Sequence, residues 1–514
     1  MLCLGLDIGS SSVKITVYDA EKGSVVASTY YPEGELRIDA PSLGWAEQNP
    51  EMWWDCIVKG CQQLFVAANF DPLEIQSIGI TYQMHGLVLV DKEKKVLRPS
   101  IIWCDSRAVP IGDKALKDLG HQYCLSRLLN SPGNFTASKL KWVKENEPEI
   151  YQKIHKIMWP GDYVAMKLTG EITTTCTALS EGIFWDYGKN ELSRRLMEYY
   201  EFEESLIPAL VSEIGMQGCL SAQMANELGL KAGTPITYRA GDQPNNAFSL
   251  NALKPGEVAA TAGTSGVIYA VTDKKISDPH SRVNTFLHVN NSPDYPINGV
   301  LLCVNGTGSL YRWVRQTFNP NISYAEMNDQ AGKSPLGAEG LHFYPFGNGA
   351  ERMLHNRQLS ATMKGLNFNK HHQGHIFRAA QEGIVFALNY GMEILKNLGI
   401  DISRIRAGNA NMFLSPLFKE AFTNISGVSL YMYNTDGSVG AALGSAIGVG
   451  YFNSFEEAFK GLTCTEVIEP DMSKVEQYKE AYKNWKLGLE QILAMEKYQA
   501  GINGTIARVD RELV

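Results

Sequence analysis

Two short stretches of glycine and hydroxyl side chains, far apart in the chain, contain the residue types that bind phosphate. The first follows Asp7 and consists of Gly9, Ser10, Ser11, Ser12 and, after one valine, Lys14. Glycine lets the backbone turn so that successive N–H groups converge, and hydroxyl groups add donors, so such a turn can hold phosphate oxygens. It is not a Walker loop, because G-x-x-x-x-G-K-[ST] is absent. A plain hairpin turn with polar residues is the alternative interpretation.

The second stretch has the same build and consists of Gly263, Thr264, Ser265 and Gly266. Two turns of the same build, one in each half of the chain, could therefore grip a single polyphosphate between them. The recurrence favours phosphate binding over the plain hairpin turn.

Two aspartates stand where predicted strands end. Asp7 could hold Mg²⁺ through water, because this ion keeps most of its hydration shell in proteins. Asp242 follows a glycine at the end of another apolar run, and its carboxylate could accept the proton of a reacting hydroxyl group. Asp242 is also a candidate metal ligand. A Gly-Asp pair is by itself a common turn, so its chemistry depends on its neighbours.

Each glycine-containing turn joins two predicted strands. Apolar residues alternate at Leu2, Leu4 and Leu6 before the first turn, and again over 13–17 after it. Period-two alternation broken by Gly-Ser is typical of an antiparallel hairpin. Residues 258–271 repeat this order of strand, turn and strand, which indicates an internal duplication with one copy in each half.

Helices are predicted around these units. Asn49 and Pro50 suit the start of a helix over about 50–68, and helical spacing with a glycine cap indicates another over 376–398. Small side chains over 440–448 predict a helix that another backbone or a flat ligand can approach closely. An amphipathic helix is expected over 474–497, followed by a loose tail over 501–514.

Composition narrows the class of protein. With 514 residues, the chain exceeds the roughly 250–300 residues at which a single core stops growing, so two large domains are expected. A formal net charge of -8 argues against a nucleic-acid partner. Nine cysteines without C-x-x-C spacing favour a reducing cytoplasm. No signal peptide or membrane span is expected. A homodimer is left open.

Ordered motifs along the chain resemble the FGGY family of carbohydrate kinases from about residue 2 to about residue 450. They are DIGSSSVK at 7–14, QMHG at 83–86, WCDSR at 103–107, SKLKWVKENEPEIY at 138–151, PGDYVAMKLTGE at 160–171, AGDQPNNA at 240–247, AGTSG at 262–266, YPFGNGAER at 344–352, GL-x8-H-x3-AAQEG at 365–383 and GSVGAALGSA at 437–446. The resemblance implies an α/β fold of two actin-like (ribonuclease H-like) ATPase domains around a central cleft. It divides the chain into residues 1–247 for sugar and phosphate, 248–500 for nucleotide, and the tail.

The resemblance also implies chemistry. In similar enzymes the aspartate of the G-D-x block, here Asp242, is the general base for a sugar hydroxyl, and ATP with Mg²⁺ supplies the phosphoryl group. Lys14 matches a position that the family fills with a basic residue, which implies a contact to the transferred phosphate. An actin-like filament or chaperone ATPase, or a sugar-binding protein without turnover, is the alternative class. Asp242 and the block at 83–86 speak against a filament or chaperone, which needs no sugar base.

The substrate is inferred from a few positions. Xylulose kinases share the Q-M-H-G block, so Gln83, Met84 and His85 are expected to contact a sugar, with Trp103 beside them. These implied contacts make a ketopentose the expected substrate, D-xylulose before other sugars or polyols, with the 5-phosphate as product. Gln243 departs from the asparagine that is usual in xylulose kinases and resembles glycerol kinases. The Asp-Arg pair at 105–107 could equally be a structural salt bridge.

The adenine end of the nucleotide is expected at a second turn in the C-terminal half. The family shows a glycine-rich block there, and this chain reads Ala-Gly-Asn-Ala-Asn over 407–411. Gly408 matches the block, and Asn409 and Asn411 carry amides for the purine edge or the ribose. A tight strand-to-helix turn is the alternative interpretation.

Overall fold

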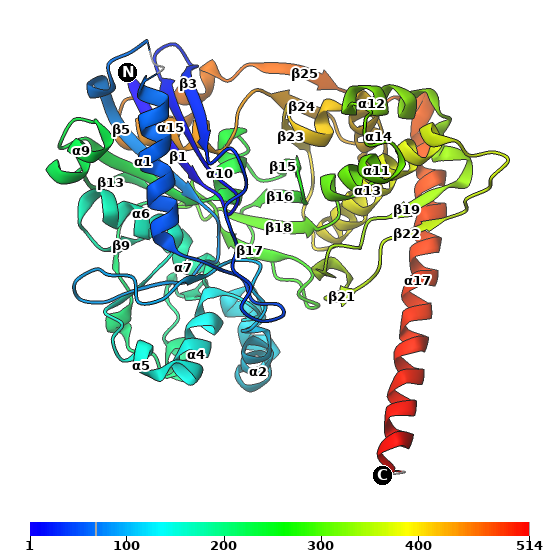
Figure 1. Ribbon diagram of the computed structural model, residues 1–514, viewed down its shortest axis with the longest axis horizontal. Helices are drawn as coiled ribbons and strands as arrows, with labels where there is room; N and C mark the ends of the chain where they lie inside the picture. Colours follow the sequence, from blue (N-terminus) through cyan, green and yellow to red (C-terminus); the bar gives the residue numbers. More distant parts are fainter. Residues whose placement is uncertain (67–68, 513–514) are drawn as a thin grey trace.

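The first predicted strand–turn–strand unit forms the centre of a six-stranded sheet (Figure 1). The structure is a computed structural model that describes residues 1–66 and 69–512, with side chains described as far as Lys497. In the sheet, β1 pairs antiparallel with β2, which pairs with β3; on the other side of β1, β5 and β14 run parallel to it before antiparallel β13 forms the edge. The strands are β1 Leu2–Ile8, β2 Val13–Asp19, β3 Ser24–Tyr31, β5 Ile75–Tyr82, β13 Ile214–Cys219 and β14 Pro235–Gly241.

The second unit forms the centre of a seven-stranded sheet with the same plan. Antiparallel β15, β16 and β18 are followed by parallel β23 and β24 and by antiparallel β25. One further strand, β17, extends the edge beside β18. The strands are β15 Glu257–Ala262, β16 Gly266–Thr272, β17 Asn284–Leu287, β18 Asn298–Val304, β23 Arg404–Gly408, β24 Leu430–Tyr433 and β25 Cys464–Ile468.

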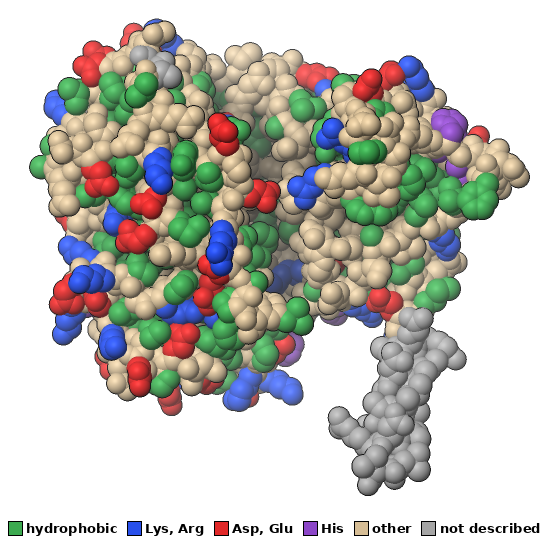
Figure 2. Space-filling view, in the orientation of Figure 1, with side chains coloured by type: hydrophobic (Ala, Val, Ile, Leu, Met, Phe, Trp, Pro, Cys, Tyr) green, Lys and Arg blue, Asp and Glu red, His purple; other side chains and the backbone are tan. Residues whose placement is uncertain are grey.

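The two sheets confirm the predicted duplication, because three antiparallel strands, two parallel ones and an antiparallel edge occur in the same order in both. Figure 1 shows the two sheets in separate lobes, and the space-filling view is hollowed between them (Figure 2). The carboxyl ends of parallel strands meet at one edge of a sheet, so each lobe gathers its turns at one edge. This is the actin-like two-domain architecture that the sequence predicted.

The helix of small residues joins the two halves. It is α15 (Gly437–Gly448), which follows β24 in the chain and packs on β1, β5 and β14 of the first sheet. A methyl group placed on Gly5 would stand 1.9 Å from Ser438 O, and one on Gly79 would stand 1.9 Å from Ala441 O. The small face therefore accommodates backbone, one of the two partners predicted for it. The division of the chain into two domains at residue 247 stays a prediction, since α15 comes from the C-terminal half of the chain but packs on the first sheet.

Two of the predicted helices occur close to their predicted bounds. Helix α1 (Pro50–Val66) begins at the predicted proline, and residues 67–68 of the predicted range lie outside the described residues. Helix α13 (Gln373–Asn397) covers the stretch predicted over 376–398 and is buried along most of its length. The other helices beside the site and the second core are α4 Thr136–Asn146, α6 Pro160–Thr169, α7 Cys176–Glu181, α10 Asp242–Ser249, α11 Gly308–Phe318, α12 Tyr324–Lys333 and α14 Pro416–Ser426.

Helix α17 (Met472–Glu512) departs from the prediction at its end. The amphipathic part agrees with the helix expected over 474–497, but the helix continues through 501–512, where a loose tail was predicted; residues 513–514 lie outside the described residues. The glycines at 501 and 504 suggested a break. Each costs a helix only about 1 kcal/mol relative to alanine, and extending an existing helix needs no new nucleation.

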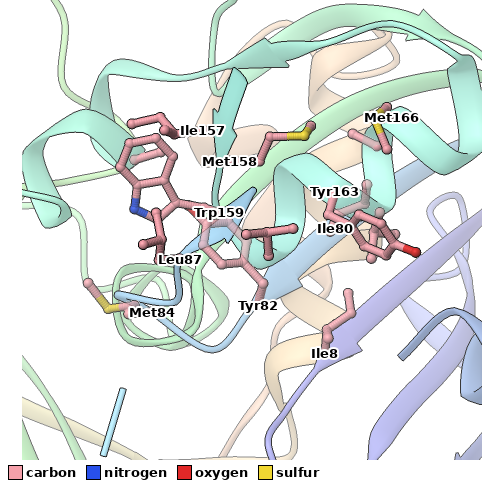
Figure 3. Close-up of a cluster of buried hydrophobic side chains, with 14 of the residues drawn as sticks. Ile8, Ile80, Tyr82, Met84, Leu87, Ile157, Met158, Trp159, Tyr163 and Met166 are labelled. Carbon is pink, nitrogen blue, oxygen red and sulfur yellow. The ribbon is translucent and has the colours of Figure 1, made fainter. Parts of the chain in front are cut away.

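The core of the first lobe holds the strand ends in place. Buried side chains from β1, β5 and α6 meet there, among them Ile8, Tyr82 and Tyr163, with Met84 and Trp159 at one end of the cluster (Figure 3). This core fixes where the chain leaves β1 and β5. Across the part of the chain that the structure describes, no helix combines the length and the apolar character needed to cross a membrane.

Candidate active site

Three neighbouring parallel strands deliver the predicted acid and amide side chains to one edge of the first sheet. Asp7 pairs with Thr81 across β1 and β5, and Gly241 at the end of β14 pairs with Tyr82. The backbone N–H of Gln83 donates to Ile8 O at 2.8 Å. Asp7, Gln83 and Asp242 therefore leave their strands side by side.

The carboxyl groups at this edge affect one another. Burial raises the pKa of Asp7 to about 7, with a further rise from Asp242 and Asp436 that Lys14 opposes. Burial raises the pKa of Asp242 to about 6, while hydrogen bonds from the Gln243 side chain and backbone favour its ionised form. A carboxylate with a raised pKa is a stronger proton acceptor than an ordinary one, which suits a base.

Lys14 lies in this acidic group and is ion-paired with Asp436. Asp436 also caps α15 by accepting from the backbone N–H groups of Ser438 and Val439. A methyl group on Gly437 would stand 2.3 Å from Asp7 Oδ2, and Asn245 Nδ2 donates to Gly437 O at 2.9 Å. The start of α15 therefore contacts Asp7 directly. It also contacts α10, the helix that begins at Asp242. The contact of Lys14 with a transferred phosphate stays a prediction.

The first predicted phosphate turn connects β1 and β2. The N–H of Gly9 donates to Ser12 O at 3.0 Å, and the Ser11 carbonyl accepts from Leu36 N. Ser10 accepts from Trp103 Nε1 at its hydroxyl oxygen, at 3.3 Å. The turn is a tight hairpin with Asp7 at its base, which is also the geometry of the plain hairpin alternative.

The second predicted phosphate turn connects β15 and β16. Gly263 and Thr264 accept from the backbone N–H groups of Gly308 and Ser309, at 2.8 and 3.2 Å, at the start of α11. The turn is therefore held against a helix start in the second lobe.

The predicted adenine residues lie next to this second turn. Gly408 ends β23, and Asn409 N donates to Tyr433 O at 2.8 Å. Asn411 Nδ2 would be 3.6 Å from a methyl group on Gly263. Since β15, β23 and β24 are adjacent and parallel, the nucleotide residues predicted for the C-terminal half form one group.

The predicted sugar residues Gln83 and Met84 follow β5, the strand that pairs with β14 next to Asp242. Met84 is buried against Gly241, where a methyl group would meet its Cγ at 2.7 Å. Gln83 Nε2 donates to Gln48 Oε1 at 3.1 Å. Among the described residues, neither Gln83 Oε1 nor Gln243 Oε1 has a hydrogen-bond partner, although both atoms are buried. Two amide oxygens beside Asp242 can thus accept from hydroxyl groups.

The other two predicted sugar residues, His85 and Trp103, differ in their burial and in their neighbours. His85 is half-buried, and its ring packs against both Phe135 and Phe286, with centroids 5.0 and 5.3 Å away. Trp103 is 47% exposed and bonds to the turn at Ser10. A sugar contact of Trp103 stays a prediction.

The neighbouring Asp105 and Arg107 make a buried structural pair. Arg107 bonds Asp105 through Nε and Nη2, reaches Glu47 at 2.7 Å, and stacks 3.8 Å above the ring of Trp45. The salt-bridge interpretation left open by the sequence is the one that the structure supports.

Three residues at this site were not predicted from the sequence. Asp436 could have been found as a helix cap before Gly437. Lys139 lies in the motif at 138–151, which pointed to no role for it, and Glu181 carries no local signal. Burial raises the pKa of Glu181 well above its usual value, with a further rise from Asp242. A methyl group on Gly241 would lie 2.6 Å from Glu181 Oε2, so this carboxyl group adjoins Asp242.

Within the described residues, no group of three or more His, Cys, Asp or Glu side chains could hold a metal ion. The donors present fit Mg²⁺ in a different way. Asp7 and Asp242 offer carboxylate oxygens close to the phosphate turn, and this ion commonly binds one or two carboxylates, water and substrate phosphates.

The duplicated sheets, with a turn at the carboxyl end of each, are the architecture of the actin-like ATPase fold. Residues 2–249 match the family model of the N-terminal domain of the FGGY family of carbohydrate kinases, and residues 258–451 match that of the C-terminal domain. The chain belongs to the FGGY family of carbohydrate kinases. It is a sugar kinase, a phosphotransferase with an alcohol group as acceptor, and FGGY kinases use ATP as the phosphate donor.

Individual relatives extend over nearly the whole chain. A xylulose kinase of Bacillus subtilis (strain 168) is 29% identical over 492 residues, which cover 94% of this chain and 96% of that protein. The crystal structure of xylulose kinase from Rhodospirillum rubrum has a TM-score of 0.84 at 25% identity, covering 96% of this chain and 99% of the other. Plasmodium falciparum glycerol kinase with ADP also reaches 0.84, at 21% identity and with 96% and 98% coverage. The last similarity shows the fold alone.

Proposed function

We propose that this sugar kinase phosphorylates a ketopentose, D-xylulose before others, to the 5-phosphate, with Asp242 as the general base. The proposal rests chiefly on the position of Asp242. The charges of Asp7 and Glu181 both interact with that of Asp242, and Met84 of the 83–86 loop packs against the preceding Gly241. A hydroxyl group held by that loop would face the carboxylate.

The transfer step needs a proton acceptor and an aligned phosphate. The sugar hydroxyl oxygen forms a bond to the γ-phosphorus of ATP while the bond from that phosphorus to the β,γ-bridging oxygen breaks. The electron pair of the broken bond leaves with ADP. The hydroxyl proton goes to a carboxylate oxygen of Asp242, and its pKa of about 6 leaves this group mostly ionised at pH 7. Mg²⁺, when bound by Asp7 and Asp242, would neutralise phosphate charge during transfer.

The remaining assignments keep the roles predicted from the sequence. We assign the turn at Gly9–Ser12 and Lys14 to the transferred phosphate, the turn at 263–266 to the other phosphates, and Gly408, Asn409 and Asn411 to the nucleoside. Backbone turns of this kind bind phosphate through N–H groups. Gln83, Met84, His85, Gln243 and the exposed Trp103 are assigned to the sugar.

The choice of a ketopentose is supported by two observations. The Q-M-H-G loop lies beside the proposed base, and the similar proteins that match nearly the whole chain include xylulose kinases. Gln243 keeps an amide oxygen that lacks a partner among the described residues, so a hydroxyl contact is available there.

A substrate panel with a base variant tests the proposal. ADP release is measured with D-xylulose, L-xylulose, D-ribulose, L-ribulose and glycerol, and D-xylulose is expected to give the highest kcat/KM. Asp242→Ala is expected to lower kcat by about 10²–10⁴-fold while calorimetry shows nearly unchanged ATP binding. Highest kcat/KM for glycerol would overturn the ketopentose assignment, and loss of ATP binding together with turnover would remove Asp242 as the base.

A further inference from the structure

The backbone of His85 adopts a conformation that is unfavourable for a histidine. Its φ is +63°, in the left-handed region where a Cβ atom crowds the backbone, and such residues concentrate at functional sites. The loop from Gln83 to Gly86 therefore needs external contacts that keep His85 in this conformation.

Two buried ionisable side chains supply those contacts, one to the N–H group and one to the carbonyl group of His85. The backbone N–H of His85 donates to Glu181 Oε1 at 3.1 Å, and Lys139 Nζ donates to the His85 carbonyl at 2.9 Å. Lys139 also donates to Ile102 O at 2.9 Å. The two residues come from different helices, α7 and α4, and are only 2% and 0% exposed.

The carbonyl group of Glu181 determines which ring nitrogen of His85 carries the proton. His85 Nδ1 lies 3.0 Å from Glu181 O. A carbonyl oxygen can only accept a hydrogen bond, so Nδ1 must be the protonated nitrogen. Burial lowers the pKa of His85 to about 3, so the ring is neutral and Nε2 is an acceptor. The rings of Phe135 and Phe286 fix its plane.

A purely structural explanation for these two buried ionisable groups is weak. Burying an ammonium and a carboxyl group costs free energy, which well-packed apolar residues would avoid. Here both groups bond to the same residue of a four-residue loop that lies between α4 and α7. Their shared effect is to fix one imidazole.

We propose that Lys139 and Glu181 are positioning residues for sugar recognition, which hold His85 so that Nε2 accepts a hydrogen bond from a substrate hydroxyl group. The proposal rests on the proposed function, since it presumes a polyhydroxy substrate beside Asp242. Substrates without a hydroxyl group at that point lose this bond. The two residues act through His85 and need not touch the sugar themselves.

Steady-state kinetics with four variants test the proposal. Glu181→Ala and Lys139→Met are expected to raise the KM for D-xylulose by about tenfold or more, since each leaves a buried backbone group of His85 unpaired. The KM for ATP should change by less than about twofold. Glu181→Gln keeps an oxygen for the His85 N–H and should restore most of the sugar affinity. Glu382→Ala is a matched control, because Glu382 is an equally buried glutamate that bonds Arg378 in α13 of the other lobe.

A double-mutant cycle with His85→Ala separates positioning from general destabilisation. If Glu181 acts through His85, Glu181→Ala adds little to the sugar KM once His85 is alanine. Multiplying effects in the double variant, or a rise in sugar KM for Glu382→Ala equal to that for Glu181→Ala, would overturn the proposal.

Nitrogen NMR of the histidine side chains tests the geometry without any substrate. In the wild-type protein, labelled with ¹⁵N-histidine, the signals missing from His85→Ala should show a protonated Nδ1 and a bare Nε2 that persist at pH 6. The opposite tautomer, or a ring that gains a proton at that pH, contradicts the proposal. If these signals are as expected but no ketopentose is phosphorylated, the proposed substrate fails and the fixed imidazole stands.

Discussion

The carboxyl group of Asp242 makes a prediction about pH at the scale of a single residue. A base must be ionised, and burial raises the pKa of Asp242 to about 6. We therefore expect kcat/KM for the sugar to be low at pH 5, to rise through about pH 6 and to level off above pH 7. The measurement is kcat/KM from pH 5 to 8 with saturating ATP. An inflection near pH 4, the ordinary aspartate range, would show that the group lies in water.

Asp7 makes a prediction about stability. Burial and the neighbouring acids raise its pKa to about 7, so ionised Asp7 destabilises the folded protein above that pH. The penalty shrinks as the pH falls and disappears below the unfolded value of about 3.9, where both states are protonated. Asp7→Asn should therefore raise Tm at pH 8 by about 2 °C or more while lowering activity.

The control for Asp7→Asn is Asp294→Asn, because Asp294 is exposed and its change should leave Tm nearly constant. Thermal unfolding is followed at pH 8 and pH 4. A Tm that falls at pH 8 in Asp7→Asn would mean that Asp7 is stabilised by partners other than Lys14.

The sequence allowed the prediction of residues whose role follows from their own neighbours in the chain. Asp242 follows a glycine at a strand end, and the Gly9–Ser12 turn follows a clear period-two strand. Glu181 and Lys139 could not be predicted in this way. Their role depends on contacts with His85 across 96 and 54 positions of the chain, and no local pattern encodes such contacts.

At the scale of elements, the approach of α15 to the first sheet depends on two glycines. A methyl group on Gly79 would stand 1.9 Å from the backbone oxygen of Ala441, and a backbone atom cannot move aside as a side-chain tip can. Gly79→Ala should therefore destabilise the protein by about 2 kcal/mol or more. Denaturant unfolding measures the change.

Gly34→Ala serves as the matched control for Gly79→Ala, because no atom lies within 4 Å of the added methyl group and φ is not positive. It should leave the free energy of unfolding nearly unchanged. Equal stabilities for the two variants would show that α15 does not lie as close to β5 as the structure has it.

Helix α17 contains a buried stripe whose spacing the sequence does reveal. Its buried residues recur every three or four positions and are Val475, Tyr478, Tyr482, Trp485 and Leu489. Trp485 also donates to Phe343 O at 2.7 Å. The end of the helix was predicted less well, because glycine lowers helix propensity without forbidding a helix.

The position of this stripe predicts the effect of shortening the chain. A chain ending at Lys497 retains every residue of the stripe and should keep its Tm within about 2 °C. A chain ending at Ser473 loses the whole stripe and should unfold at a much lower temperature or fail to fold. Thermal unfolding of both shortened chains, followed by circular dichroism, measures their Tm values. A large fall in Tm for the chain ending at Lys497 would mean that stabilising contacts lie beyond residue 497.

At the scale of the whole molecule, duplication was predictable and the connection between the halves was not. The two strand–turn–strand units repeat in sequence, so two related sheets could be expected. The ion pair of Lys14 with Asp436 joins residues 422 positions apart. It exists because α15 leaves the second sheet and packs on the first, an arrangement that depends on the complete fold.

The residues predicted to bind the sugar and those predicted to bind the nucleotide lie on different lobes. The acids and the 83–86 loop belong to the first sheet, whereas the turns at 263–266 and 408–411 belong to the second. Transfer requires the sugar oxygen and the γ-phosphorus to come within roughly 3–3.5 Å. Exclusion of water during transfer also favours closure of the lobes. Binding of one substrate should therefore favour the closed arrangement that binds the other.

The resulting prediction is a reciprocal coupling between sugar and nucleotide. Saturating D-xylulose should lower the Kd of a non-hydrolysable ATP analogue by about 5–150-fold, and the analogue should lower the Kd of the sugar by the same factor, as linkage requires. Calorimetry with Asp242→Asn, which should bind but not turn over, gives both numbers. Because His85→Ala removes the proposed sugar contact, it should weaken sugar binding. Equal nucleotide affinity with and without sugar would mean that the lobes do not close as a unit, and transfer would then depend on a cleft already shaped for both substrates.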